Sequence, residues 1–263
     1  MKYCLGVGLH NLYFDIAIVN QNNKIMKSCR CFYDRSRDIS SNIYKAYKKH
    51  FDKYAIEAVG VGISNNIEFK DEVIYSIKAF SFNRYNLKQA LVKQFKTEVL
   101  IIEETYAASL GVYYDSPKQS LLYVILDNKI SNSFVVDGDI ILLENDIDLS
   151  KNEMLNEKCA KDTLKKQFLM QDLDDEYIGG YFLSKKSNVR SIIKDWAICL
   201  NKELEKIVKI LKVDKIVFAG YIGAYLETFK EYMGVTNRIE TASIDSHKLQ
   251  TLIGISHLIF KDK

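Results

Sequence analysis

Residues 97–111, TEVLIIEETYAASLG, read as a buried strand that runs directly into a helix. The run at 99–102 is continuously apolar, which is typical of a parallel strand covered on both faces, and the apolar residues after it recur at helical spacing. Two carboxylates, Glu103 and Glu104, stand at the junction. In open α/β sheets the carboxyl ends of strands border the ligand site. The stretch therefore predicts an α/β fold with Glu104 as a candidate general base.

A simpler interpretation of the same two carboxylates is that they only begin a helix. Asp and Glu are enriched in first helical turns because the helix dipole favours negative charge there. The local sequence alone leaves both interpretations of Glu103 and Glu104 open.

The first half of the chain alternates predicted strands and helices. Three consecutive strands are predicted within residues 2–33, and a further parallel strand at 55–63. Helices are predicted at 37–54 and 86–95, with Asn86 as the N-cap of the second. The only proline, Pro117, is predicted to mark the crossing into a second lobe.

The second half repeats a triplet of strands. These strands are predicted at 121–126, 131–136 and 139–143, with Asp137 and Gly138 as a hairpin turn. Residues 144–190 are charged and weakly periodic, with short helices expected at 159–170 and 176–183. A long core helix at 189–211 has apolar residues at helical spacing. The remaining predicted elements are a strand at 214–220, a helix at 224–233, a strand at 238–241 and a helix at 246–260.

Several segments resemble the ROK family of sugar kinases and sugar-responsive repressors. Residues 102–111 resemble its END-A-x-A-A-A-L-G segment, and three others agree in order: LGVGLHNLYFDIAIVN, LLYVILDNKISNSFVVDGDIIL and VDKIVFAGYIG. The chain then ends with ASIDSHKLQTLIGISHLIF, as the family does with its last helix. The resemblance implies a two-lobed, actin-like ATPase (ribonuclease H-like) fold with a duplicated strand triplet. The first lobe would span residues 1–116, the second 117–245, and the last helix, 246–263, would pack back on the first lobe.

The resemblance also implies the sugar side of a site. Glu104 falls where the family has its catalytic Asp. The family's P-G-P-V-D segment near the sugar corresponds to residues 64–68, SNNIE. Asn65, Asn66 and Glu103 are therefore candidate substrate-binding residues.

The nucleotide side departs from the family. The first phosphate loop, D-x-G-G-T-K, corresponds to GLHNLY at 8–13, and the second, G-T-G-x-G-G-G, to DNKISNS at 127–133. Both have lost their glycines, which in the family let the backbone approach phosphate. The candidate cofactor-binding residues are His10, Asn11, Asn128, Lys129 and Gly220. A lone Lys in a turn, such as Lys129, is more often a solvated surface residue. Gly220 is also consistent with a helix start, and His10 and Asn11 could bind a ligand other than nucleotide phosphate.

Two functions follow from this comparison. The first is a ROK-type homologue that has lost phosphotransfer and acts as a sugar-like small-molecule binder, regulator or protein-interaction partner, with no cofactor. The alternative is an active ATP-dependent sugar kinase, of the glucokinase, fructokinase or N-acetylhexosamine kinase type, with Glu104 as general base and ATP and magnesium as cofactors. The loss of both glycine loops favours the first. A homodimer is possible in either case.

Charge and the start of the chain limit the partners. The 37 basic and 34 acidic residues give a net charge of +3 and form no long blocks of one sign. We therefore expect no direct nucleic-acid binding and no membrane association. The first strand begins within a few residues of Met1, which leaves no room for a helix-turn-helix or a signal peptide, so a cytoplasmic protein is expected.

The five cysteines are scattered and predict reduced thiols. Cys29 and Cys31 lie in a strand-like run, so both would point to one face; metal binding is possible there, but core or surface thiols are the favoured interpretation. The family's zinc cluster would fall between residues 146 and 160, where only Cys159 and no histidine occurs. No bound metal is expected. His247 and His257, on the last helix, are expected to be structural.

Overall fold

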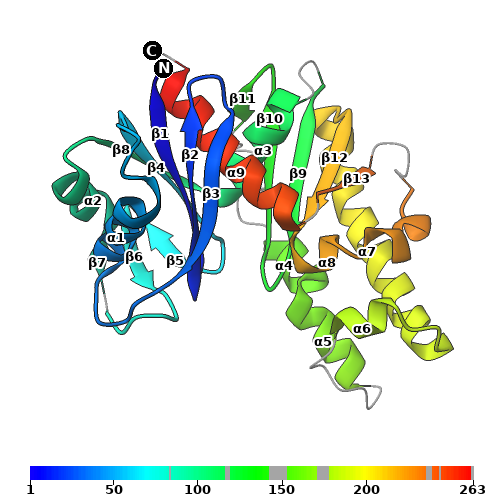
Figure 1. Cartoon of the computed structure of the whole chain (residues 1–263). Coiled ribbons are helices and arrows are strands. Elements are labelled where there is room, and N and C mark those ends of the chain that lie inside the picture. Colours follow the sequence, from blue (N-terminus) through cyan, green and yellow to red (C-terminus); the bar gives the residue numbers. More distant parts are fainter. Residues whose placement is uncertain are drawn as a thin grey trace. The chain divides into compact units, whose positions relative to one another are not determined.

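The chain divides into two compact units. The computed structural model describes residues 1–82, 84–115, 119–141, 153–170, 178–234, 239–242 and 244–261. One unit comprises Met1–Asp115 with Lys248–Lys263, and the other comprises Ser116–His247. Figure 1 shows the elements of each unit in chain order. Pro117, the predicted crossing, lies outside the described residues.

The first unit is built on a five-stranded sheet. Its strands are β1 (Tyr3–Leu9), β2 (Tyr13–Asn20), β3 (Ile25–Phe32), β4 (Ala58–Ile63) and β8 (Glu98–Glu103). They lie in the order β3-β2-β1-β4-β8. The first three strands form an antiparallel meander, whereas β4 and β8 run parallel to β1. Strands β1, β2 and β4 are buried almost throughout, as their continuous apolar runs predict.

Helices cover both faces of this sheet. α1 (Ile39–Phe51) and α2 (Leu87–Phe95) contribute to one apolar cluster, and α3 (Glu104–Asp115) and α9 (Ile244–Phe260) to another. Alternate residues of each strand face opposite ways, so neighbouring positions of β2 belong to different clusters. Asn86 caps α2 as predicted, because its side chain accepts a hydrogen bond from the Gln89 N–H. Helix α9, red in Figure 1, packs on the sheet through its residues from Lys248 onward.

Glycines let α9 approach α3 and the sheet closely. A Cβ atom added to Gly254 of α9 would lie 1.8 Å from the carbonyl oxygen of Ala107 in α3. A Cβ on Gly60 of β4 would lie 2.1 Å from a methyl group of Ile255. Side chains at these two positions would force the helices and the sheet apart.

A small three-stranded sheet was not predicted from the sequence. It consists of β5 (Glu68–Lys70), β6 (Val73–Ser76) and β7 (Tyr85–Asn86). The strands are short and largely polar, so they carry little hydrophobic alternation. Ile74 and Ile77 are buried and belong to the same apolar cluster as residues of α1 and α2, so this part of the chain packs against those helices.

The second unit repeats the topology of the first sheet. Its strands are β9 (Leu121–Leu126), β10 (Ile130–Val136), β11 (Asp139–Ile141), β12 (Lys215–Ala219) and β13 (Ile239–Thr241). Their order, β11-β10-β9-β12-β13, again combines an antiparallel meander with two parallel strands. This confirms the duplicated strand triplet. Asp137 and Gly138 form the predicted turn, with φ values of 52° and 85°.

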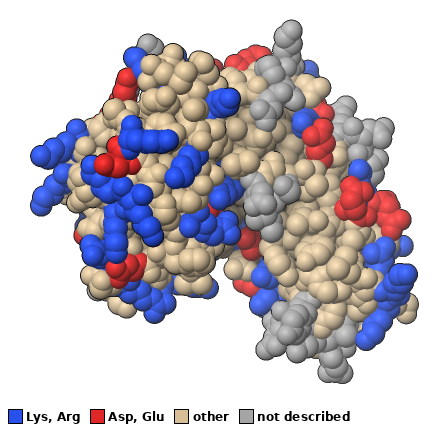
Figure 2. All heavy atoms as spheres, in the orientation of Figure 1, with Lys and Arg blue, Asp and Glu red and all other residues tan. Residues whose placement is uncertain are grey.

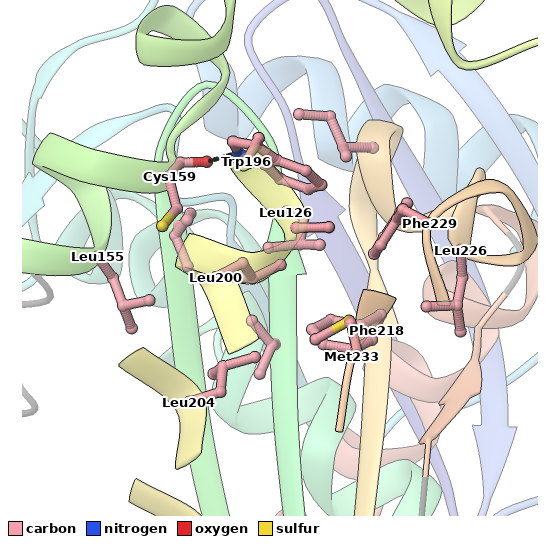
Figure 3. Close-up of a cluster of buried hydrophobic side chains, with 14 of the residues drawn as sticks. Leu126, Leu155, Cys159, Trp196, Leu200, Leu204, Phe218, Leu226, Phe229 and Met233 are labelled. Carbon is pink, nitrogen blue, oxygen red and sulfur yellow. Dashed lines mark hydrogen bonds between the residues drawn. The ribbon is translucent and has the colours of Figure 1, made fainter. Parts of the chain in front are cut away.

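The helices of the second unit pack around one buried tryptophan. They are α4 (Glu153–Cys159), α5 (Lys161–Leu169), α6 (Ile178–Phe182) and α7 (Ser187–Leu211). Figure 3 shows Trp196 of α7 inside the buried apolar cluster of the second unit. Its Nε1 donates a hydrogen bond of 2.8 Å to the Cys159 carbonyl. The long predicted helix is thus confirmed, whereas the helix predicted at 159–170 begins after a break at Ala160. Among the described residues, no helix combines the length and apolarity needed to cross a membrane.

The helix predicted at 224–233 is wrong. The chain instead forms α8 (Gly220–Gly223) followed by two 3₁₀ turns, η1 (Leu226–Thr228) and η2 (Lys230–Tyr232). Leu226 and Phe229 are three residues apart and both buried, and three residues make one turn of a 3₁₀ helix. This spacing is compatible with an α-helix as well as with a 3₁₀ helix, so the sequence pattern could not distinguish the two helix types. Residues 142–143 and 176–177, where other predicted elements end or begin, lie outside the described residues.

Candidate functional site

Three parallel strands of the first unit end at the same edge of the sheet. Leu9 of β1 is paired with Ile63 of β4, and Ile63 with Glu103 of β8. The segments that follow these strands therefore lie side by side. They carry most of the residues proposed from the sequence: His10, Asn11, Asn65, Asn66, Glu103 and Glu104.

A network of charged side chains, here called the Asp15 cluster, lies at this edge. It consists of His10, Asp15, Arg30, Glu104 and Lys248. Arg30 donates two hydrogen bonds to the Asp15 carboxylate, of 3.0 and 3.1 Å, and the Lys248 Nζ lies 3.1 Å from Asp15 Oδ1. These contacts bring one carboxylate of β2 together with cations from β3 and α9.

His10 lies between the two carboxylates of the cluster. Its Nε2 is 3.6 Å from Asp15 Oδ2 and 3.9 Å from Glu104 Oε1. Burial alone would lower the pKa of His10, but the charges of Glu104 and Asp15 outweigh it and raise the pKa above its ordinary value. The imidazole also packs on Tyr13, with ring centroids 4.6 Å apart. The two carboxylates therefore make His10 easier to protonate than a free histidine.

Asp15 is the buried centre of the cluster. Its side chain is only 1% exposed, and burial alone would raise the pKa of its carboxyl group. Close contacts with His10, Arg30 and Lys248 outweigh burial and hold the pKa of Asp15 well below its ordinary value. The Arg30 guanidinium also stacks over the Tyr13 ring, 4.2 Å from its centroid. Asp15 is thus ionised at neutral pH and orients the surrounding cations.

Asn11 holds the turn after β1 in place. Its Nδ2 donates a hydrogen bond of 2.9 Å to the Asn66 carbonyl, and its Oδ1 accepts one of 3.0 Å from the Lys78 N–H. Both polar ends of its amide are therefore engaged with backbone. Asn65 and Asn66 are half-buried in the turn after β4, and Glu103 is exposed at the end of β8. These three side chains are placed where a ligand at the strand ends could reach them.

In the second unit, Asn128 and Lys129 form the turn between β9 and β10. Next to them, the Asn156 side chain of α4 forms two hydrogen bonds with the backbone of Ile130. The Ile130 N–H donates to Asn156 Oδ1 (2.6 Å), and Asn156 Nδ2 donates to the Ile130 carbonyl (3.1 Å). An open cavity of about 580 Å³ lies beside the turn. Its lining residues are Asn128, Lys129, Asn156, Glu157, Ala160, Asp162, Thr163 and Lys166.

Gly220 begins α8 directly after β12. It has a φ of +85°, and an added Cβ would lie 2.7 Å from the Leu126 carbonyl oxygen. The close approach of β9 and the positive φ both require glycine here. The packing of the unit therefore accounts for Gly220 without a ligand.

Comparison with known proteins identifies the fold. No family model matches the sequence. No curated protein matches it either. Among solved structures, a ROK hexokinase from Thermus thermophilus superposes with a TM-score of 0.77 at 14% identity, covering 100% of both chains. The chain has the fold of the ROK proteins. This is the actin-like ATPase fold expected from the sequence.

Two further ROK structures contain ligands. A ROK protein from Streptococcus pneumoniae in complex with sucrose matches with a TM-score of 0.72 at 11% identity, over 100% of both chains. A ROK glucokinase from Streptomyces griseus in complex with glucose and AMPPNP matches with a TM-score of 0.67 at 10% identity, covering 98% of this chain and 99% of that one. Identities this low show the shared fold alone.

Within this ROK fold, the charged partners of His10 and Asp15 were not predicted from the sequence. Asp15, Arg30 and Lys248 were not proposed as site residues. One signal was available: Asp15 is a single carboxylate within the apolar strand YFDIAIVN, and a buried charge there needs partners. The identity of those partners could not be read from the sequence, because Arg30 and Lys248 come from different elements.

Proposed function

We propose that the chain is a ROK homologue that binds a sugar or sugar-like molecule and has lost ATP-dependent phosphotransfer. The observation that carries this proposal is the position of His10 beside Glu104. A general base must accept a proton, and a neighbouring cation stabilises the charged carboxylate and weakens it as a base. Glu104 is buried and lies 3.9 Å from the His10 imidazole, whose protonation the neighbouring carboxylates promote.

The nucleotide side supports the same proposal. Kinases of this fold need backbone N–H groups that reach phosphate oxygens, and the residues of this chain do not fit that requirement. The first turn carries the His10 imidazole where the resemblance places a glycine. In the second turn, the Ile130 N–H is already bonded to Asn156. We therefore assign no phosphotransfer step to ATP or magnesium.

The sugar side keeps groups suited to hydroxyl recognition. Asn65 and Asn66 offer amide donors and acceptors, and Glu103 offers carboxylate oxygens. All three lie at one edge of the first sheet. The related structures solved with sucrose and with glucose make sugars the first ligands to test.

Isothermal titration with a panel of hexoses and N-acetylhexosamines tests the binding proposal. If a sugar binds, Asn65→Ala and Glu103→Gln should each weaken binding by about 10-fold, the loss of a hydrogen bond worth about 1.5 kcal/mol. Glu98→Gln is the matched control, because Glu98 lies at the opposite end of β8. A panel in which nothing binds would refute the sugar ligand.

The alternative is an active ATP-dependent sugar kinase with Glu104 as its base. The observation that favours it is the cavity beside Asn128 and Lys129, whose lining contains two cations, Lys129 and Lys166, alongside two carboxylates, Glu157 and Asp162. The two candidates differ in one outcome, because only the kinase forms ADP in the presence of a bound sugar. Loss of that activity in Glu104→Gln would identify the base.

A further inference from the structure

Three metal-binding side chains meet on the first unit, away from the Asp15 cluster. Cys29 and Cys31 lie on β3, the edge strand of the sheet in Figure 1, and His50 lies in the last turn of α1. One ligand atom from each lies within 4.8 Å of the others. Within the described parts of the chain, this is the one group of three such side chains found close enough to share an ion.

The spacing of the two sulfur atoms matches a tetrahedral metal site. Cys29 Sγ and Cys31 Sγ are 3.8 Å apart. Two thiolates bound tetrahedrally to zinc at about 2.3 Å are separated by about 3.8 Å, and an imidazole nitrogen would then lie about 3.6 Å from each sulfur. Alternation along β3 places both thiols on the face that contacts α1, so little movement is needed to bring the three ligands around one ion.

We propose that Cys29, Cys31 and His50 bind one zinc ion, with the fourth position open to water or another small ligand. All three side chains are half-buried, so an ion can reach them from solvent. The site uses none of the residues aligned with the ROK zinc cluster. It revises the expectation, based on that cluster and on the scattered cysteines, that the chain binds no metal.

The charge balance permits an ion on this basic part of the molecule. Figure 2 shows Lys and Arg side chains gathered over the unit that contains α1 and β3, and Lys27 and Lys49 are exposed close to the three ligands in sequence. Binding forms two zinc–sulfur bonds and one zinc–nitrogen bond, and both thiols release their protons to solvent. Two thiolates and Zn²⁺ together are neutral, as two thiols are. The net charge of the site is therefore unchanged.

The ion would join two elements of the unit. The C-terminal turn of α1 already contacts β3 through Lys27, whose Nζ donates a hydrogen bond of 3.1 Å to the His50 carbonyl. A metal bridge from β3 to His50 would add a second link. Zinc binding should therefore raise the melting temperature of the protein.

A second thiol pair provides an internal control. Cys159 Sγ and Cys199 Sγ, in the other unit, are 3.7 Å apart but no described histidine completes a three-ligand group with them. If sulfur spacing alone produced metal binding, both pairs would bind. The proposal requires the histidine and therefore only the pair on β3.

Cobalt titration of the full chain tests the site, after removal of metal and in a reductant that is not a thiol. We expect one equivalent of Co²⁺ to bind with the thiolate charge-transfer and ligand-field bands of a tetrahedral site, and zinc to displace it. Cys29→Ser and His50→Asn should lose these bands, whereas Cys199→Ser should keep them. Circular dichroism of the metal-free variants checks folding, and His50→Asn, at a half-buried helix end, carries the test if the cysteine variant misfolds.

Two results would overturn the proposal. One is the absence of a stoichiometric cobalt spectrum in the wild-type protein. The other is a spectrum that persists in folded His50→Asn or disappears in folded Cys199→Ser, because the ion would then be bound elsewhere.

Discussion

Replacing Asp15 by Asn should destabilise the first unit more than any conservative change at its surface. Asn has nearly the same shape as Asp, so the substitution removes charge while leaving the packing of β2 intact. Arg30, Lys248 and His10 would then lose the carboxylate that they share. The expected effect is therefore electrostatic and can be estimated from the burial of these groups.

Breaking a buried ion pair by removing one partner typically costs about 3–5 kcal/mol. The Asp15 side chain is 1% exposed and Lys248 17%, which places this network near that range. Arg30 is 39% exposed, so water can compensate part of its loss. The Asn amide oxygen can still accept a hydrogen bond. We expect the free energy of unfolding to fall by about 2–4 kcal/mol at neutral pH.

The difference between wild type and Asp15→Asn should depend on pH with a defined sign. The pKa of Asp15 is lowered in the folded state, so its contribution is complete above the unfolded value of about 3.9. The contribution is lost as the pH falls from there towards the folded value. The stability difference should therefore shrink under acid conditions.

Urea denaturation followed by circular dichroism measures both effects. Asp52→Asn is the matched control, because Asp52 forms an exposed i,i+4 pair with Lys48 and such pairs contribute about 0–1 kcal/mol. If Asp15→Asn cost no more than the control, or if its cost were the same at neutral and acid pH, the buried network would not stabilise the unit as argued.

Two further predictions concern single residues of the first unit. Because the pKa of His10 is raised on folding, its contribution is complete below about pH 6.5 and is lost as the pH rises through the folded value. Wild type should therefore lose stability relative to His10→Gln as the pH rises above about 6.5, and a constant difference in urea titrations across that range would contradict this. Gly254→Ala should lower the free energy of unfolding by about 3 kcal/mol, the upper end of the usual cost of overpacking, since its Cβ would lie 1.8 Å from a backbone oxygen. Gly234→Ala, whose nearest contact is a side-chain oxygen at 3.2 Å, should cost less than about 1 kcal/mol, and equal melting temperatures of the two variants would refute the packing argument.

The sequence predicted those parts of the fold that depend on local periodicity. The strand triplets, the helix around Trp196 and the turn at Asp137 and Gly138 all have strong patterns within a few residues. The 3₁₀ turns after α8 were missed because Leu226 and Phe229 suit an α-helix equally well. Both side chains are buried in the apolar cluster that contains Trp196, and this tertiary packing cannot be predicted from the local sequence pattern.

The candidate site was predictable only where it follows strand ends. His10 and Glu104 could be placed because parallel neighbouring strands end together at one edge. Their contact, and the roles of Arg30 and Lys248, depend on how β3 and α9 pack against β2. The metal ligands show the same limit: strand alternation put Cys29 and Cys31 on one face, but the approach of His50 from α1 required the structure.

Calorimetric titration with ATP and magnesium, with and without a bound sugar, tests the central proposal most directly. ADP formation is followed in the same samples, and a ROK glucokinase serves as the positive control. We predict no saturable nucleotide binding up to millimolar concentration and no sugar-dependent ADP. Both phosphate loops carry other residues at the positions where the family has glycine, and His10 lies beside Glu104. Micromolar ATP binding with sugar-dependent ADP formation that disappears in Glu104→Gln would contradict the proposal and establish an active kinase.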